Sequence, residues 1–204
     1  MRIARRQAGR ADPQGLRSEL HAIPRSDDGR GRPICGPACT RRAAAGSPGS
    51  PDSRVCSRHC PDIPRALSSD PDNFPLETRI APLVFELKRL AVFEPCWSCE
   101  GHNGADGTLW KIPRVWFYCR SVVHLRLLAD SVKRLFLARK LTTPWHVVIT
   151  FSDGDNAETT FSLEPSLDRN RPDLTTIQRD IDAIAARLHD MVIAEADRLA
   201  AAAG

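Results

Sequence analysis

The uneven distribution of aromatic residues constrains the fold of this chain more than any other feature. All of the Trp, Tyr and Phe side chains lie between Phe74 and Phe161. Residues 1–73 contain no aromatic residue and are rich in Arg, Pro and Gly. Such a segment buries too little apolar surface to offset the entropy lost when its backbone is ordered. The sequence therefore predicts a disordered leader over 1–73 and a single folded domain over 74–204.

Charge is distributed as unevenly as the aromatic residues. Residues 1–70 contain 13 Arg, no Lys and 7 acidic side chains, a net charge of +6, while residues 71–204 have a net charge of −2. Surfaces that bind nucleic acids are strongly basic, so the near-neutral folded part is not expected to have a nucleic-acid partner. A start site assigned too far upstream is an alternative explanation of a leader with this composition.

No segment has the features of a targeting signal or a membrane anchor. The basic start MRIARRQAGR is not followed by an apolar run of signal-peptide length, and no stretch approaches the ~20 apolar residues of a membrane-spanning helix. We therefore expect no membrane association and a cytoplasmic location. In that compartment the seven cysteines are expected to be thiols or metal ligands, not a disulfide framework.

Hydrophobic periodicity over the folded part predicts an α+β domain. The strand 114–119 has large side chains on both faces, which is typical of a central strand. Residues 94–108 contain three glycines and no periodicity, and are expected to form a loop. The mixed order of elements favours a small two-layer domain, with a mostly antiparallel sheet packed by about three helices. The predicted helices are 78–91, 122–140 and 176–202, and the predicted strands are 110–112, 114–119, 145–152 and 159–165.

Each predicted helix begins after a residue that can cap it. Thr78, Ser121 and Thr175 have hydroxyl groups that can accept hydrogen bonds from backbone N–H groups of the first turn. The last helix, 176–202, is longer than packing in a small domain requires. Its alanine-rich end is expected to project, to fray or to pair with another copy. It is the segment expected to contact a homodimer partner or another protein.

One predicted loop carries side chains that are suited to metal binding. The run Cys96-Trp-Ser-Cys99-Glu-Gly-His102 places three candidate ligands within seven residues. Two cysteines at this spacing can bind one Zn²⁺ ion when the backbone between them forms a knuckle, and the glycine lets His102 turn to the same side. Cys119 is the expected fourth ligand, because it precedes a helix N-terminus that favours a thiolate. His124, in the first turn of that helix, is the alternative fourth ligand.

The pattern favours a structural zinc-binding domain over an enzyme, and three alternatives remain. In the first alternative, the cysteines are ordinary thiols and His102 is a turn residue. The protein is a non-catalytic interaction or dimerisation module in the second, and a thiol-dependent enzyme or redox protein using Cys99 in the third. Thioredoxin-like motifs start a helix at the first cysteine, and EGHNGADG cannot form one here, which disfavours the redox alternative.

Three segments of the chain resemble segments shared by a group of small uncharacterised bacterial proteins. They are EPCWSCEGH, PRVWFYCRS and TFSDGDNAETTFSLEP. The likeness covers Leu76 to Leu163 and omits the leader. The resemblance supports the domain boundary, and it implies no activity, cofactor or site residue.

Overall fold

The structure is a computed structural model, and it describes residues 13–24, 75–151, 159–167 and 172–202. Within these residues the chain forms a four-stranded antiparallel sheet, a two-stranded sheet and five helices. The predicted α+β class is confirmed. The elements are α1 Pro13–His21, α4 Ala81–Arg89, β1 Glu94–Cys99, β2 His102–Asn103, β3 Leu109–Lys111, β4 Arg114–Tyr118, α5 Val122–Leu137, β5 Trp145–Phe151, β6 Thr159–Pro165, α6 Leu174–Ala185 and α7 Leu188–Ala202.

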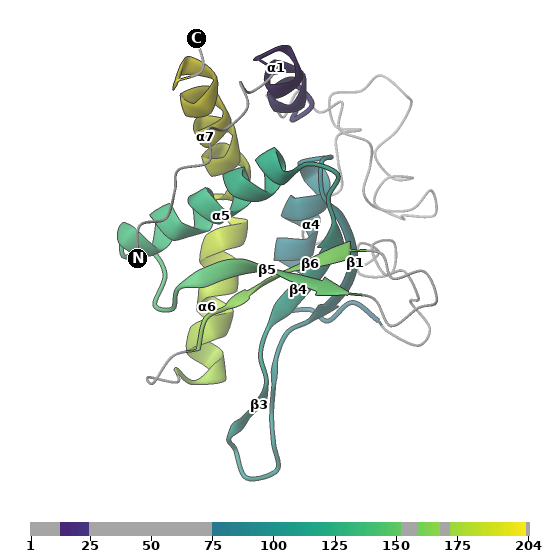
Figure 1. Cartoon of the computed structure of the whole chain (residues 1–204). Helices are drawn as coiled ribbons and strands as arrows, with labels where there is room; N and C mark the ends of the chain where they lie inside the picture. The colour runs from purple at the N-terminus through teal and green to yellow at the C-terminus, as the bar shows by residue number, and fades with distance from the viewer. Residues whose placement is uncertain (1–12, 25–74, 152–158, 168–171, 203–204) are drawn as a thin grey trace, which may run out of the picture.

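Strand β4 lies inside the larger sheet, whose strand order is β1-β4-β6-β5 (Figure 1). All three strand pairings are antiparallel. Strands β5 and β6 form the predicted hairpin, in register from Trp145 opposite Pro165 to Phe151 opposite Thr159. The turn of this hairpin, 152–158, lies outside the described residues. The central position predicted for β4 is confirmed, because β1 and β6 bond to its two edges.

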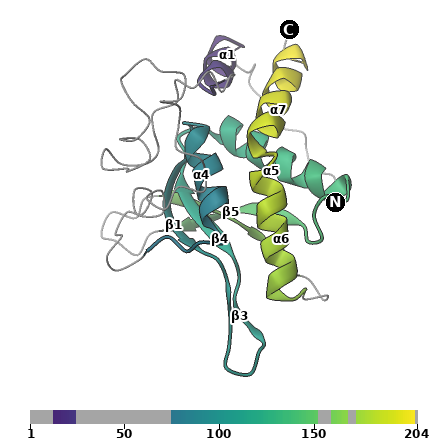
Figure 2. The same cartoon turned by 180° about the vertical axis from the view of Figure 1, so that it is seen from behind.

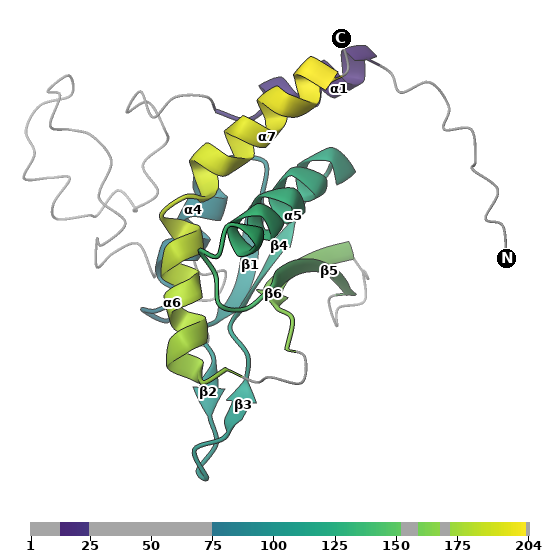
Figure 3. The same ribbon diagram turned by 90° about the vertical axis from the view of Figure 1, so that its left-hand side faces the viewer.

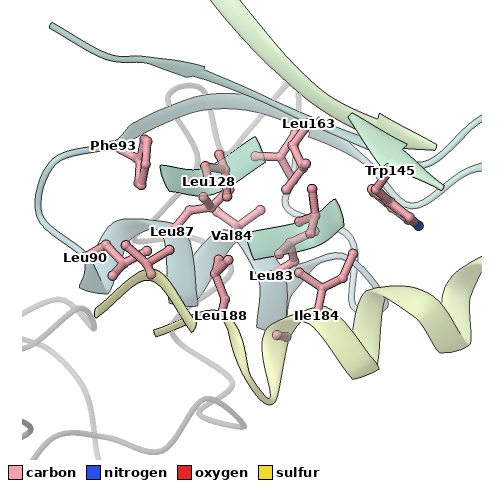
Figure 4. Close-up of a cluster of buried hydrophobic side chains, with 14 of the residues drawn as sticks. Leu83, Val84, Leu87, Leu90, Phe93, Leu128, Trp145, Leu163, Ile184 and Leu188 are labelled. Atoms are coloured by element: carbon pink, nitrogen blue, oxygen red, sulfur yellow. The ribbon is translucent and has the colours of Figure 1, made fainter. Parts of the chain in front are cut away.

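One face of the sheet is packed against helices, which Figures 1 and 2 show from opposite sides. Val115, Phe117 and Leu163 are completely buried on this face. Since neighbouring residues of a strand point to opposite faces, Trp116 lies on the other face, where its ring packs against Trp97 with centroids 5.0 Å apart. The core cluster of Figure 4 includes Leu83, Val84, Leu87, Leu90, Phe93, Leu128, Trp145, Leu163, Ile184 and Leu188.

The prediction that residues 94–108 form a loop is wrong, because much of this segment is β-structure. Strand β1 pairs with β4 at the edge of the sheet, with an irregular register between Pro95 and Trp97. Proline lacks a backbone N–H group and is tolerated on edge strands and at bulges. After Gly101 the chain continues as β2 and β3, a narrow two-stranded arm that extends away from the rest of the domain (Figure 3). An edge strand and a projecting arm bury little apolar surface on either face, so the hydrophobic periodicity of their sequence is weak.

The helix starts agree only in part with the predicted caps. Ser121 caps α5 as predicted, and its hydroxyl accepts a hydrogen bond from the N–H group of Val123. Helix α4 instead begins after Ile80, without a side-chain cap. Helix α6 begins after Asp173, whose carboxylate accepts a hydrogen bond from the N–H group of Thr176. That backbone hydrogen bond also lowers the pKa of the Asp173 carboxyl group.

The C-terminal helical stretch is long but is not the single helix predicted over 176–202. A turn at residues 186–187 separates α6 from α7. Helix α7 then packs against α5, where the buried Glu195 carboxylate forms ion pairs with Arg134 and Arg198. None of the helices among the described residues combines the length and the apolar character needed to cross a membrane.

A short segment of the predicted leader belongs to the packed structure. Residues 13–24 form α1 and a following turn, which contact α5 and α7. The side chains of Leu20 and Ile23 are completely buried in the core. The structure thus differs from the predicted disorder over this stretch, because composition averaged over a long leader conceals one short apolar pattern. Residues 1–12 and 25–74 lie outside the described residues, and the rest of the leader stays a prediction.

A buried carboxylate joins α6 to the loop that precedes β5. The side chain of Asp180 is 2% exposed. It accepts hydrogen bonds from the backbone N–H groups of Thr142 and Thr143, each at 2.9 Å, and from the Thr142 hydroxyl at 3.0 Å. Hydrogen bonds to a charged acceptor are stronger than neutral ones, so Asp180 fixes the position of this loop.

We expect Asp180→Ala to lower the free energy of unfolding by about 3 kcal/mol, because it leaves two N–H groups without acceptors. Urea denaturation of the full chain measures this change. Asp182→Ala is the matched control, since Asp182 is exposed on the same helix and, among the described residues, forms an ion pair with exposed Arg79. It should cost less than about 1 kcal/mol. Equal losses in the two variants would contradict the role assigned to Asp180.

Candidate metal centre

Three side chains of metal-binding type meet at one corner of the domain. They are Glu77 in the turn before α4, Cys99 at the end of β1 and His102 at the start of β2. One ligand atom of each residue lies within 4.8 Å of the ligand atoms of the other two. We call this group the Glu77–Cys99–His102 cluster.

The backbone between Cys99 and His102 turns sharply at Gly101. This glycine has φ +84°, a left-handed conformation that side chains rarely adopt. A Cβ atom at Gly101 would lie 2.6 Å from Cδ1 of Leu174 and 2.8 Å from Cδ of Pro113. The turn therefore requires glycine for its conformation and for its close contact with the start of α6. It brings His102 back towards the thiol that ended the preceding strand.

Two glutamate side chains hold this corner together from opposite sides. The Glu77 carboxylate accepts a hydrogen bond of 2.7 Å from the N–H group of Glu100. The Glu100 carboxylate accepts a hydrogen bond of 2.8 Å from the N–H group of Arg79. The Gln178 side chain of α6 donates to the Glu100 carbonyl at 3.1 Å. These contacts fix the positions of the cluster residues, and they also give Glu77 a structural role that is independent of any ion.

The imidazole and the carboxylate of the cluster are already in contact. Nε2 of His102 lies 2.9 Å from Oε1 of Glu77, and the two side chains are 39% and 30% exposed. The Cys99 side chain is buried, and its Sγ accepts a hydrogen bond of 3.4 Å from the N–H group of Gly101. The cluster therefore has a buried thiol at its inner side and two solvent-accessible ligands at its outer side.

Burial raises the pKa of the Cys99 thiol above its ordinary value. The Gly101 N–H group acts in the opposite direction, the Glu77 carboxylate adds to the rise in pKa, and the positive charges of Lys111 and Arg114 reduce it. Cys99 is thus a protonated thiol at neutral pH. A reactive nucleophile needs a lowered pKa, so this environment does not activate Cys99.

Only two of the four predicted ligands, Cys99 and His102, are brought together. Cys96 lies within the extended strand β1, where residues three apart are separated by roughly 10 Å, and a knuckle cannot form. Cys119 follows the opposite end of β4, since Cys99 pairs with Arg114 at the other end. The thiol of Cys119 donates a hydrogen bond to the Ser121 carbonyl at 3.3 Å. The predicted four-ligand set is therefore not assembled.

The alternative fourth ligand, His124, is also engaged elsewhere. Its Nε2 lies 2.8 Å from the carbonyl oxygen of Glu19 in α1. Sequence reasoning in turn missed Glu77, which is 22 positions before Cys99 and belongs to no local motif. The only available signal was an acidic residue just ahead of a predicted helix, and this is too common to select one glutamate.

Comparison of the chain with protein families, curated proteins and solved structures finds no match. The resemblance to small bacterial proteins therefore stays a prediction.

We expect Gly101→Ala to destabilise the domain more than Gly107→Ala by at least about 2 kcal/mol. Both glycines have positive φ, but nothing lies within 4 Å of a Cβ atom at Gly107. Gly107→Ala thus incurs only the conformational cost, about 1 kcal/mol. Thermal and urea unfolding of the two variants make the comparison. Similar losses would show that the contact of Gly101 with Leu174 is not restrictive.

The raised pKa of Cys99 predicts slow alkylation of the native protein. In the presence of a chelator, the pH profile of its reaction with iodoacetamide should have its midpoint above that of the same thiol in urea-unfolded chain. The sign follows because the folded chain holds the thiol proton more tightly, so less thiolate is present at any given pH. Peptide mapping measures Cys99 separately. A midpoint lower in the native protein would contradict the prediction and favour a thiol enzyme.

Proposed function

We propose that this protein is a small zinc-binding domain in which Glu77, Cys99 and His102 hold the ion. The observation that carries the proposal is the convergence within 4.8 Å of a thiol and an imidazole that are close in sequence with a carboxylate from a distant segment. These are the three side-chain types that bind Zn²⁺ in proteins. A thiolate ligand disfavours Mg²⁺ and Ca²⁺, which prefer oxygen ligands.

The negative charge of Glu77 beside the Cys99 thiol also favours a cation. Burial raises the pKa of Cys99 most, and the Glu77 carboxylate adds to the rise, because two negative charges at this distance repel each other. A bound Zn²⁺ ion would replace the thiol proton of Cys99 and would attract both anionic ligands. One thiol proton is released for each ion bound, so affinity should fall as the pH is lowered.

The number of ligands favours a site with one open position. Structural zinc sites are usually closed by four protein ligands, while sites with three protein ligands bind water in the fourth position. Glu77 and His102 are partly exposed, so water can reach an ion bound between them. The proposal therefore keeps zinc but replaces the fully protein-ligated site expected from the sequence.

A bound ion would connect the parts of the domain that meet at this corner. It would join the turn before α4 and the end of β1 to the base of the projecting arm, where β2 begins (Figure 3). The role that we propose is thus structural, namely to fix the arm relative to the sheet. None of the described cysteines forms a disulfide, which suits the reducing cytoplasm, the location that we propose.

The other two functions considered from the sequence have less support. A thiol nucleophile is disfavoured by the raised pKa of Cys99. A dimer through the C-terminal helix needs a free apolar stripe, but Leu188, Val192 and Ala196 of α7 are buried in the core of the same chain.

Metal titration of the full chain tests the zinc proposal. The background variant carries Ser in place of Cys35, Cys39, Cys56 and Cys60, so that leader thiols do not contribute. We expect this protein to bind one equivalent of Zn²⁺ and to melt at a higher temperature with the ion than with a chelator. Co²⁺ should give the absorption of a thiolate-to-metal transition.

Matched variants assign the ligands. Cys99→Ser, Glu77→Gln and His102→Gln should each reduce zinc affinity at least tenfold, while Cys96→Ser and Cys119→Ser should leave it unchanged. Retention of wild-type affinity in Cys99→Ser would refute the proposed site. Loss of binding in Cys96→Ser or Cys119→Ser would support the ligand set expected from the sequence instead.

A further inference from the structure

Helix α1 occupies a defined surface on the helical layer of the domain. It lies beside α7, at the end of the molecule opposite the arm (Figures 1 and 3). Leu20 and Ile23 are completely buried there, and Leu16 packs against the core. The receiving surface is formed by the start of α5 and by α7. We call it the α5–α7 groove.

The α5–α7 groove has polar side chains that contact the backbone of α1 and of its following turn. Nε2 of His124 lies 2.8 Å from the Glu19 carbonyl oxygen, and Nε2 of His189 lies 3.2 Å from the Pro24 carbonyl oxygen. A carbonyl only accepts, so both rings donate. His124 and His189 are both buried, so each makes its hydrogen bond away from water. The Glu19 carbonyl also accepts a hydrogen bond of 3.2 Å from the N–H group of Ala22, so His124 adds a second donor near the end of the helix. His189 supplies a donor to a carbonyl beyond the helix.

A carboxylate of α1 also interacts with the start of α5. The side chain of Glu19 accepts a hydrogen bond from the hydroxyl of Ser121, the N-cap of α5. Negative charge is stabilised at a helix N-terminus, where N–H groups point outwards. The groove therefore selects a short helix with two apolar anchors, an acidic residue just before the first anchor, and backbone carbonyl groups that accept hydrogen bonds from the two histidines.

Helix α1 depends on this groove for its own structure. It has nine residues, and isolated helices of this length are unstable in water. The fully buried apolar side chains of the described segment 13–24 are Leu20 in the helix and Ile23 just after it, and 50 residues, 25–74, separate this segment from the rest of the described domain. Helix formation and docking are thus one event, as in a segment that folds on binding.

We propose that the α5–α7 groove is a helix-binding site and that residues 13–24 of the same chain are its reversible occupant. The chain's own segment occupies the groove in preference to that of a second copy. Covalent connection makes its docking intramolecular, and intramolecular docking outcompetes a second copy at micromolar concentration. The proposal is independent of zinc, since none of the groove residues belongs to the Glu77–Cys99–His102 cluster.

Peptide binding to the full chain tests the groove. In the variant Leu20→Asp/Ile23→Asp the chain's own segment cannot dock, and the groove is open. A fluorescently labelled peptide of residues 11–26 should bind this variant at least tenfold more tightly than it binds the wild-type chain, whose groove is filled. The same peptide with both Asp substitutions should not bind. Equal affinity for the variant and the wild type, or binding to neither, would overturn the proposal.

Substitution of the two histidines distinguishes specific docking, which uses their hydrogen bonds, from non-specific hydrophobic binding. In the open-groove variant, His124→Leu/His189→Leu should weaken peptide binding at least tenfold, because the Glu19 and Pro24 carbonyl groups lose their imidazole donors. His124→Gln/His189→Gln, which keeps a side-chain N–H group, should restore most of the affinity. Equal binding to both pairs would overturn the assigned role of the histidines.

Hydrogen exchange of the wild-type chain tests reversibility without any variant. The amides of residues 17–22 should exchange at least a hundredfold faster than those of residues 126–134 in α5, because α1 undocks while the domain stays folded. Exchange of both segments at the rate of global unfolding would overturn reversible docking. Sedimentation of the wild-type chain should show a monomer, and a concentration-dependent dimer that dissociates in the Leu20→Asp/Ile23→Asp variant would identify a second copy as the occupant instead.

Discussion

Pairing of β1 with β4 determines where the chemically distinctive side chains of this domain lie. Strand β4 needs hydrogen-bond partners on both edges, because its residues Val115 and Phe117 are completely buried. The hairpin partner β6 satisfies one edge and β1 satisfies the other. Antiparallel pairing then places Cys99 opposite Arg114, at one end of β4, and leaves Cys119 beyond the other end. The separation of the two thiols follows from this register, and so does the position of the arm that leaves β1 at Gly101.

The parts of the fold that the sequence predicts are those in which local patterns and tertiary packing agree. Alternation in β5 and β6, the large side chains of β4 and the hydroxyl of Ser121 before α5 each indicate the element that forms. Elements that depend on distant partners were missed. Strand β1 contains Pro95 and no regular alternation, and α1 has only a few apolar residues within a polar leader. Both become ordered because another part of the chain supplies a matching surface.

The candidate site shows the same division between local and distant information. Cys99 and His102 were identifiable because they are close in sequence and the intervening Gly101 allows the turn. The expected role of Cys96 assumed a knuckle, and the extended backbone of β1 moves its side chain away from that of Cys99. Glu77 could not be found by spacing, because it reaches the cluster through hydrogen bonding of its segment to Glu100. A motif indicates which groups are available, and strand pairing decides which of them meet.

The order of the sheet and the helices along the chain has a consequence for biosynthesis. The ribosome releases a chain from its N-terminus, so the sheet and α5 emerge before the helices that contain Ile184 and Leu188, which help to bury the core. The backbone N–H groups of Thr142 and Thr143 likewise lack their carboxylate acceptor until Asp180 has been synthesised. Until α6 and α7 arrive, the nascent sheet exposes apolar surface of the kind that chaperones recognise. Folding of the domain during translation is thus postponed until its last helical segments have been made.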